Sequence, residues 1–240
     1  MKRRVLLCTL LWLGARLAVA APPVPPPLKI SLPFQGMVAL AVLDARPNII
    51  SGDRKETFVG FSRSLYGIPY PAHTQSKKPF AQDLSTLASR ALKLGGAAPK
   101  SLVTSPFKGR QGAVKALQDS GAERLILIEI RDWWSDTLVH TDLHYDLALT
   151  VLNAQGQELG SSSLMGHDAV GKRERPERRD LATATNDILA SLFTAEQVTA
   201  AFGSGATPVA KAASCTVEQI LKMKDAGLTE EQIKAACGSS

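Results

Sequence analysis

LILIEI, residues 125–130, is the stretch that sets the fold of this chain. It lies within the longer run 124–134 and is apolar at positions that would face both sides of a strand. Strands that are buried on both faces occur in the middle of a sheet that helices cover. We therefore expect residues 124–134 to form a central strand.

The segments that follow predict an antiparallel pair beside this central strand. Residues 137–152 alternate between apolar and polar side chains, as a half-buried strand does. The sequence NAQG at 153–156 is a hairpin signal, and residues 157–168 would form the returning strand. Residues 178–202 then carry apolar side chains at helical spacing, which predicts a final helix.

The segments before the central strand alternate between short strands and helices. Residues 37–44 are an apolar run that ends at Arg46-Pro47, a pattern typical of a buried strand. The other expected elements are a short strand at 58–61, a helix from Lys78-Pro79 to Gly95-Gly96, a strand at 101–104 and a helix at 112–120. This order predicts an α/β fold, an α+β sandwich whose helices pack on a mixed sheet of about five strands, βαβαββα-like.

The start of the chain has the composition of a secretory signal peptide. Basic residues at 2–4 precede an apolar stretch at 5–13, and the sequence AVA at 18–20 fits the cleavage rule. The apolar stretch is shorter than the roughly 20 residues that span a bilayer. We expect cleavage near Ala20 and Ala21, a periplasmic location, and membrane association that is at most peripheral.

The net charge speaks against a nucleic-acid partner. The chain carries 28 Lys and Arg against 22 Asp and Glu, a formal net charge of +6. Four of the basic residues lie in the signal peptide, which has no acidic residue, and this leaves +2 for the rest of the chain. Proteins that bind nucleic acid usually carry a basic stripe. We therefore expect no nucleic-acid partner, and no motif of the sequence indicates a cofactor.

Composition divides the chain into five parts. They are a signal peptide at 1–20, a Pro-rich tether at 21–36, an α/β core domain at 37–202, a flexible linker at 203–214 and a helical hairpin at 215–238. In the hairpin, TVEQ at 216–219 and TEEQ at 229–232 each fit a helix capping box. Two antiparallel helices would bring Cys215 and Cys237 together as a disulfide worth about 3 kcal/mol, with two free thiols as the alternative. The hairpin also offers a surface for oligomerisation.

Three segments carry a resemblance to a known family: VALAVLDARP at 38–47, LILIEIRDWW at 125–134 and AQGQELG at 154–160. Through them the chain resembles, over residues 30–200, the YajG-like family of small bacterial envelope lipoproteins. That family belongs to a group of α/β domains with the N-terminal domain of TolB and the core of the curli secretion lipoprotein. The resemblance implies a non-enzymatic role at the envelope. The chain departs from the family because it lacks the acylated cysteine, and its tail resembles short helical hairpins appended to other bacterial proteins.

His and Asp side chains alternate along the expected strand 137–152. On a strand, His140, Asp142 and His144 would share one face and apolar residues the other. His167 lies on the expected partner strand, and the predicted turn places it near Asp142. These side-chain types suit a divalent metal ion. The pattern has two readings: a metal site, or the solvated face of a half-buried strand, which we prefer.

Four aromatic residues are candidates for contact with a partner. Tyr66 and Tyr70 lie in a Gly- and Pro-rich stretch, LYGIPYPAH at 65–73, and rigid aromatic side chains on loops are typical binding anchors. Packing of this loop over the sheet is the alternative. Trp133 and Trp134 are neighbours on a strand, so they face opposite sides and at most one belongs to the core.

These patterns favour an exported, non-catalytic protein of the periplasm or cell envelope that acts as a binding or assembly module for another protein or polymer. The sequence GSSS at 160–163 lacks the glycine pattern of a nucleophile elbow, and we expect no catalytic residues. One alternative is a divalent-metal-binding protein or metalloenzyme that uses the His/Asp strand. Another is a factor associated with cell-wall polysaccharide, whose aromatic side chains stack on sugars.

Overall fold

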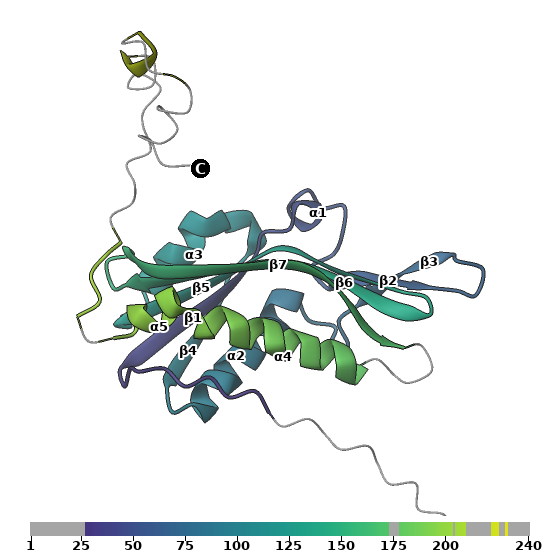
Figure 1. Ribbon diagram of the computed structural model, residues 1–240, viewed down its shortest axis with the longest axis horizontal. Helices are drawn as coiled ribbons and strands as arrows, with labels where there is room; N and C mark the ends of the chain where they lie inside the picture. The colour runs from purple at the N-terminus through teal and green to yellow at the C-terminus, as the bar shows by residue number, and fades with distance from the viewer. Residues whose placement is uncertain (1–26, 173–177, 204, 210–221, 226–228, 230–240) are drawn as a thin grey trace, which may run out of the picture.

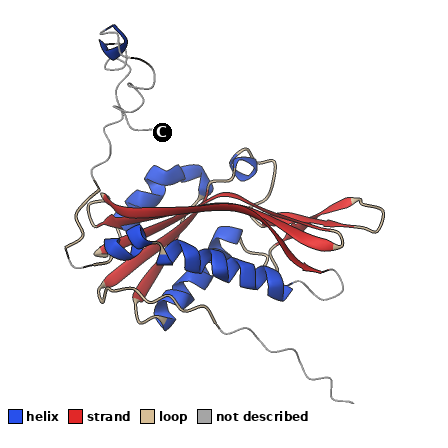
Figure 2. Ribbon diagram, in the orientation of Figure 1, coloured by secondary structure: helices blue, strands red, loops and turns tan. Residues whose placement is uncertain are grey.

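The computed structural model describes residues 27–172, 178–203, 205–209, 222–225 and 229. It confirms a mixed α/β fold, in which helices pack on a curved sheet of seven strands (Figures 1 and 2). The strands are β1 (Met37–Asp44), β2 (Phe58–Arg63), β3 (Pro69–His73), β4 (Ala98–Val103), β5 (Arg124–Thr137), β6 (His140–Asn153) and β7 (Glu158–Lys172). The helices are α1 (Pro47–Ile50), α2 (Phe80–Leu94), α3 (Gly109–Gln118), α4 (Arg178–Thr194) and α5 (Glu196–Ala201), with a 3-10 turn η1 (Pro106–Lys108).

Several predicted segments lie outside the described residues. They are the signal peptide at 1–20, the first part of the tether at 21–26, and both Cys215 and Cys237. Of the predicted hairpin at 215–238, the structure describes a helical segment at 222–225 and residue 229. The disulfide and the hairpin's role in oligomerisation therefore stay predictions. Among the described helices, none is long and apolar enough to span a membrane.

The long strand β5 joins two differently built ends of the sheet. On one side it pairs antiparallel with β6 along its whole length, and β6 pairs with β7. On the other side, residues 124–130 pair parallel with β1, and residues 135–137 pair parallel with β2. The strand order is therefore β4-β1-β5-β6-β7 at one end and β3-β2-β5-β6-β7 at the other.

Helices cover the two faces of the sheet unequally (Figure 1). One face packs against α2, α4 and α5 and contributes side chains such as Leu40 and Ile128 to the larger core. On the opposite face, α3 buries Leu125 and Leu127 completely, near the start of β5. We call the end with β1 and β4 the closed half, because both faces of β1 and of residues 125–128 of β5 are buried there. We call the end with β2, β3 and residues 132–137 of β5 the open half.

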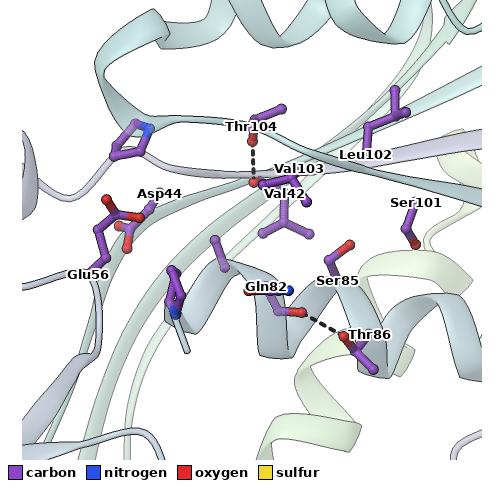
Figure 3. A pocket seen from close by; sticks show the side chains of 13 residues that line it. Val42, Asp44, Glu56, Gln82, Ser85, Thr86, Ser101, Leu102, Val103 and Thr104 are labelled. Carbon is purple, nitrogen blue, oxygen red and sulfur yellow. Dashed lines mark hydrogen bonds between the residues drawn. The ribbon is translucent and has the colours of Figure 1, made fainter. Parts of the chain in front are cut away.

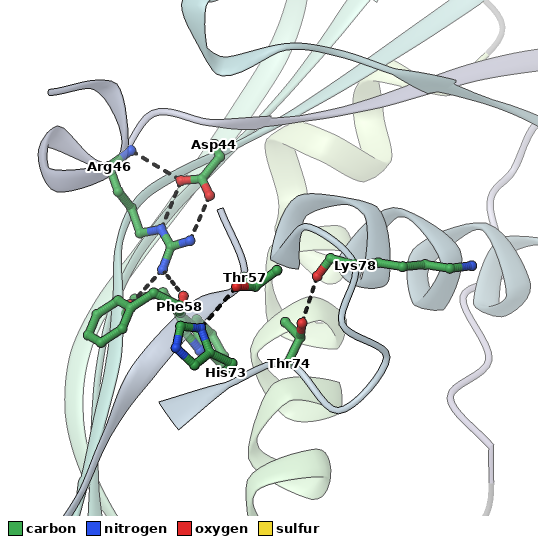
Figure 4. Close-up of polar contacts among 8 residues, drawn as sticks. Asp44, Arg46, Thr57, Phe58, His73, Thr74 and Lys78 are labelled. Atoms are coloured by element: carbon green, nitrogen blue, oxygen red, sulfur yellow. Dashed lines mark hydrogen bonds and ion pairs between the residues drawn. The ribbon is translucent and has the colours of Figure 1, made fainter. Parts of the chain in front are cut away.

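A buried ion pair fills the junction between β1 and β2 (Figure 4). Asp44, at the end of β1, accepts hydrogen bonds from Nε and Nη2 of Arg46 at 2.8 and 2.6 Å. Both side chains are 1% exposed. Nη1 of Arg46 donates to the carbonyl oxygens of Phe58 and Trp133 at 2.7 and 3.1 Å. One guanidinium therefore links β1, β2 and β5 at the point where β1 ends and β2 begins beside β5.

The sheet has seven strands where the sequence predicts about five. The difference includes β3, whose sequence PYPAH contains two prolines and is typical of a loop. Proline is tolerated in a strand at the edge of a sheet, and β3 is an edge strand. The single helix predicted at 178–202 is also wrong in detail, because the structure has two helices there, α4 and α5, separated at Ala195.

The described part of the predicted tether packs on the core. Ile30 and Leu32 are 5% and 8% exposed, and the backbone N–H of Ile30 donates to the carbonyl of Ala91 at 3.0 Å. Together with Leu28 and Phe34 they occupy every second position, so an extended segment has one apolar face. The high proline content of residues 21–36 hides this alternation in the sequence.

Candidate functional site

The outer face of the open half carries a stack of three rings. Trp134 of β5, His144 of β6 and His167 of β7 pair across neighbouring strands. The Trp134 and His144 rings are 4.0 Å apart with an angle of 4° between their planes, and the His144 and His167 rings are 4.1 Å apart at 17°. Leu143 and Tyr145 of β6 face the core. The polar face of β6 is therefore partly ordered by ring stacking, worth roughly 0.2–1 kcal/mol for each cross-strand pair.

This stack limits what the two tryptophans offer a ligand. His144 has a ring on each side, and it covers one face of Trp134, so that face is closed to a sugar. Trp133 points to the opposite side of the sheet, is 2% exposed and packs on Phe80 with ring centroids 4.9 Å apart. Of the two predicted contact residues, Trp133 is therefore a core side chain and Trp134 a half-buried member of the stack.

Asp142 lies between two of the histidines predicted as metal ligands. Its carboxylate oxygens are 3.2 Å from His140 Nε2 and 3.7 Å from His167 Nε2. The backbone partner of His167 is His144, because a bulge beside Leu152 shifts the register of β7. In parallel stacked imidazoles the nitrogen lone pairs lie in the ring planes, so His144 and His167 do not converge on one ion. Within the described residues, no group of three or more His, Cys, Asp or Glu side chains is arranged to hold a metal ion.

An ion pair fixes the β2–β3 hairpin to the end of β5. Arg63 of β2 donates from Nε to Asp136 Oδ1 at 2.7 Å and from Nη2 to Oδ2 at 2.6 Å. The hydrogen bond to the Asp136 carboxylate raises the pKa of Arg63, so the guanidinium stays charged at any physiological pH. Nη1 of Arg63 also donates to the carbonyl of Gly67 at 3.2 Å. The same side chain thereby holds both the strand and its turn.

The tip of this hairpin exposes large apolar side chains. Leu65 and Tyr66 are 82% and 91% exposed, and Ile68 and Tyr70 are 52% and 55% exposed. Both tyrosines that the sequence singles out therefore face solvent. Large apolar side chains that gather at one exposed place are typical of contact surfaces. We call residues 65–70 the hairpin tip.

A groove lies next to the hairpin, between α2 and α4. Its volume of about 650 Å³ falls within the range of roughly 300–1,000 Å³ that is typical of ligand sites. Its apolar lining is contributed by Val59, Ala72, Phe80, Leu87, Trp133 and Leu181. Ala72 and Tyr70 are two residues apart on β3 and so share a face. The apolar surface of the groove therefore continues along β3 to the hairpin tip.

The hydroxyl groups along this groove are engaged within the protein. Thr74 donates to the carbonyl of Lys78 at 2.6 Å, Ser135 to that of Val59 at 3.3 Å and Thr185 to that of Leu181 at 2.7 Å, while the hydroxyls of Thr137 and Thr141 are 2.9 Å apart. A hydroxyl that already donates its hydrogen offers a ligand only acceptor lone pairs. The groove therefore suits an apolar ligand surface better than a polar one.

A smaller cavity lies at the carboxyl ends of β1 and β4 (Figure 3). Its volume is about 150 Å³, below the range that is typical of ligand sites. Asp44 lines it, but both carboxylate oxygens bind Arg46. Thr104 reaches across from the end of β4 to donate to the carbonyl of Val42 at 2.6 Å. Asp44 and Thr104 are thus engaged within the protein, and we assign no ligand to this small cavity.

Sequence reasoning misses the groove, because its lining comes from α2, α4 and four strands that no single segment reveals. The hairpin tip is signalled by Tyr66 and Tyr70 within one short stretch. Alternation places Ala72 and Tyr70 together once β3 is recognised as a strand. The sequence does not identify β3 as a strand, and its pairing with β2 is seen only in the structure.

Comparison with known proteins gives weak likenesses to solved structures. No family model and no curated protein matches the chain. A Xanthomonas campestris protein of family DUF330 is 14% identical, with a TM-score of 0.44, over 74% of this chain and 90% of that one. PelC from Paraburkholderia phytofirmans, solved as a dodecamer, is 11% identical, with a TM-score of 0.38, over 68% of this chain and 90% of that one. Lipoprotein GNA1162 from Neisseria meningitidis is 12% identical, with a TM-score of 0.32, over 65% of this chain and 98% of that one. With TM-scores below 0.5, none of them assigns a function, and the resemblance to the YajG-like family stays a prediction.

Proposed function

We propose that the chain is an exported, non-catalytic protein of the cell envelope that binds another protein or polymer through the open half of its sheet. The observation that carries this proposal is the apolar surface that runs from the groove beside α2 along β3 to the hairpin tip. Export rests on the signal peptide predicted at 1–20.

The exposed aromatic rings at the tip support binding by contact with a large partner. The side chains of Tyr66 and Tyr70 are wide and rigid, so ordering them on binding costs little conformational entropy. Tyrosine is also enriched among the residues that dominate interface energies. Arg63 holds the turn through Gly67, so the tip has a defined position before any partner binds. A preorganised contact costs less conformational entropy on association.

The polar groups near the groove support a non-catalytic role. The hydroxyl of Thr57 and Nδ1 of His73 form a pair at 2.9 Å (Figure 4). An activated hydroxyl nucleophile needs a base that a third group orients. In the described part of the chain, no carboxylate contacts His73 in that way. Asp83, on the other side of the groove, accepts a hydrogen bond from Ser76 at 2.7 Å.

Site-specific photocrosslinking of the full chain in cells that export it tests this proposal. A photoreactive phenylalanine replaces Tyr66 in one variant and Phe107, which is 69% exposed beside the closed half, in a matched control. We expect a defined crosslinked product from position 66 and none from position 107. The product should be lost when Leu87→Glu places a charge in the groove.

The identity of the crosslinked product separates the two classes of partner. A protein product supports an assembly module, and a carbohydrate product supports the polysaccharide-associated alternative. No product from position 66, or a product that Leu87→Glu leaves unchanged, contradicts the proposal.

A further inference from the structure

The sheet ends in three edge strands, and two of them are protected against pairing. β3 carries Pro69 and Pro71, and β4 carries Pro99 followed by Lys100. Proline has no N–H to donate to a neighbouring strand, and lysine on an edge discourages pairing. Natural sheets use both devices to keep other chains from adding to their edges.

The third edge, β7, has neither device in its interior; its one lysine, Lys172, is its last residue. In its interior, residues 159–171, the sequence contains no proline and one charged side chain, Asp168. Met165, near its middle, is 79% exposed. In the part of the chain that the structure describes, β7 pairs with β6 alone. A long edge without protection is a template on which another strand can add.

The chain itself already uses the beginning of this edge. The backbone N–H of Val209, in the segment 205–209 that follows α5, donates to the carbonyl of Glu158 at 2.8 Å. Among the described residues, no further backbone hydrogen bond from outside the sheet reaches residues 159–170. The outward groups at the start of β7 are therefore accessible to an added segment, and the rest of the strand continues the same edge.

A second groove runs along β7 on the side of α4, which lies beside the strand in Figure 1. Its volume is about 520 Å³. Its apolar lining consists of Leu164, Ala169 and Val170 of β7 with Ala184 and Ile188 of α4. This groove lies on the other flank of α4 from the groove next to the hairpin, which contacts Leu181 and Thr185. An edge strand beside a helix with an apolar cleft between them is the arrangement that peptide-binding domains use for strand addition.

Two carboxylates give this groove a charge preference. Asp168 of β7 and Asp187 of α4 both line it. Tyr145 donates from its hydroxyl to Asp168 Oδ2 at 3.0 Å. Burial, and then the bond to Asp168, raises the pKa of Tyr145, so the phenol keeps its proton. Asp168 and Asp187 thus give the groove two carboxyl groups that suit a cationic partner.

We propose that the groove between β7 and α4 binds an extended segment of another polypeptide as an added strand, with apolar residues at alternate positions and a Lys or Arg opposite Asp168 and Asp187. Alternate side chains of an added strand point to the same face, so they would enter the groove together. Backbone hydrogen bonds to β7 would supply affinity, and the groove would select the side chains. This site is separate from the tip and groove of the proposed function and does not depend on them.

Binding of synthetic peptides to the full chain tests this proposal. The probe is a blocked octapeptide with valine at alternate positions and one central lysine, measured by calorimetry. The first control replaces that lysine by glutamate, and the second methylates the backbone nitrogens that would face β7. We expect the glutamate peptide to bind about threefold weaker. We expect the methylated peptide to bind at least about tenfold weaker, because strand addition needs its N–H donors.

Two variants of α4 locate the site. Ala184→Trp fills the groove and should weaken the lysine peptide by about tenfold or more. Ala182→Trp adds the same side chain at an exposed position of the same helix and should leave binding unchanged. Asp187→Lys should reverse the preference between the lysine and glutamate peptides. Circular dichroism confirms that each variant is folded.

Three results would overturn this assignment. One is no binding of the lysine peptide to the folded chain. Another is equal binding of the methylated and unmethylated peptides, which would show that the edge of β7 does not pair. The last is an equal effect of Ala182→Trp and Ala184→Trp, which would place the peptide elsewhere.

Discussion

The two ends of β5 run through different surroundings. Near its start, Leu125 and Leu127 are completely buried under α3, with β1 on one side and β6 on the other. Near its end, after a bulge between Ile130 and Asp132, Trp134 has the same strand β6 beside it but is only half-buried. The comparison separates two roles: the closed half is held by burial on both faces, whereas the open half leaves a face, a hairpin and an edge for contacts.

The junction between the halves is polar although it is buried. Asp44 and Arg46 stand where β1 stops and β2 takes its place beside β5. The guanidinium donates to the backbone carbonyls of Phe58 and Trp133 at that point. A break in strand pairing inside a core needs such a group, because unpaired buried carbonyls are costly.

The largest effect is expected from Arg46→Ala at this junction. The change leaves Asp44 as a buried carboxylate without its partner and should lower the free energy of unfolding by about 3–5 kcal/mol. Urea denaturation measures it. The double variant Asp44→Leu with Arg46→Met removes both charges and should recover much of the loss. A loss of about 1 kcal/mol or less is what an exposed ion pair contributes, and it would contradict the burial of the pair between Asp44 and Arg46.

The next largest effect is expected from Leu127→Ala in the closed half. Leu127 is 0% exposed, and deleting its side chain under α3 should cost about 2–5 kcal/mol. The matched control is Leu138→Ala at the open end of the sheet, where the side chain is 36% exposed and the expected change is within about 0.5 kcal/mol. Similar losses for the two variants, measured by thermal unfolding, would remove the distinction between the halves.

A smaller effect is expected from His144→Ala in the ring stack. The change removes the ring that lies 4.0 Å from Trp134, and should cost about 1 kcal/mol. It should also shift the tryptophan emission of the folded protein, since one face of Trp134 becomes exposed. His140→Ala serves as the control, because its imidazole contacts Asp142 instead of the stack. An equal spectral change in both variants would argue against the stack.

The smallest effect on stability is expected at the hairpin tip. Leu65→Ser combined with Tyr66→Ser replaces two exposed side chains and should change the free energy of unfolding by no more than about 0.5 kcal/mol. With the photoreactive phenylalanine placed at position 70 instead of position 66, the same double variant should abolish the crosslinked product. A large destabilisation would instead show that the tip packs on the rest of the molecule, and its exposed residues would not be a contact surface.

The central strands could be predicted from sequence because their patterns are local. LILIEI is apolar on both faces and lies at the centre of the sheet, and the alternation of residues 137–152 matches the two faces of β6. β3 could not be predicted, since its prolines are compatible with a strand only at an edge. β3 is an edge strand because it pairs with β2, which itself pairs with β5, and this arrangement cannot be read from the sequence of β3.

The candidate sites were predictable only in part. The sequence singles out Tyr66 and Tyr70 in one short Gly- and Pro-rich stretch but leaves open whether they pack over the sheet, and the structure shows both exposed. The ring stack could not be predicted, because His167 reaches His144 only through a one-residue bulge in β7. A shift of one residue moves every side chain of a strand to the other face. The grooves on the two flanks of α4 combine elements that are distant in sequence.

Amide hydrogen exchange of the full chain tests the division of the sheet most directly. We expect residues 38–43 of β1 and 125–130 of β5 to exchange only through global unfolding, because both faces of these strands are covered. Residues 58–63 of β2 and 69–73 of β3 should exchange faster, through local opening. Equal protection in the two halves would overturn this division, because a uniformly protected sheet would have no separate open half.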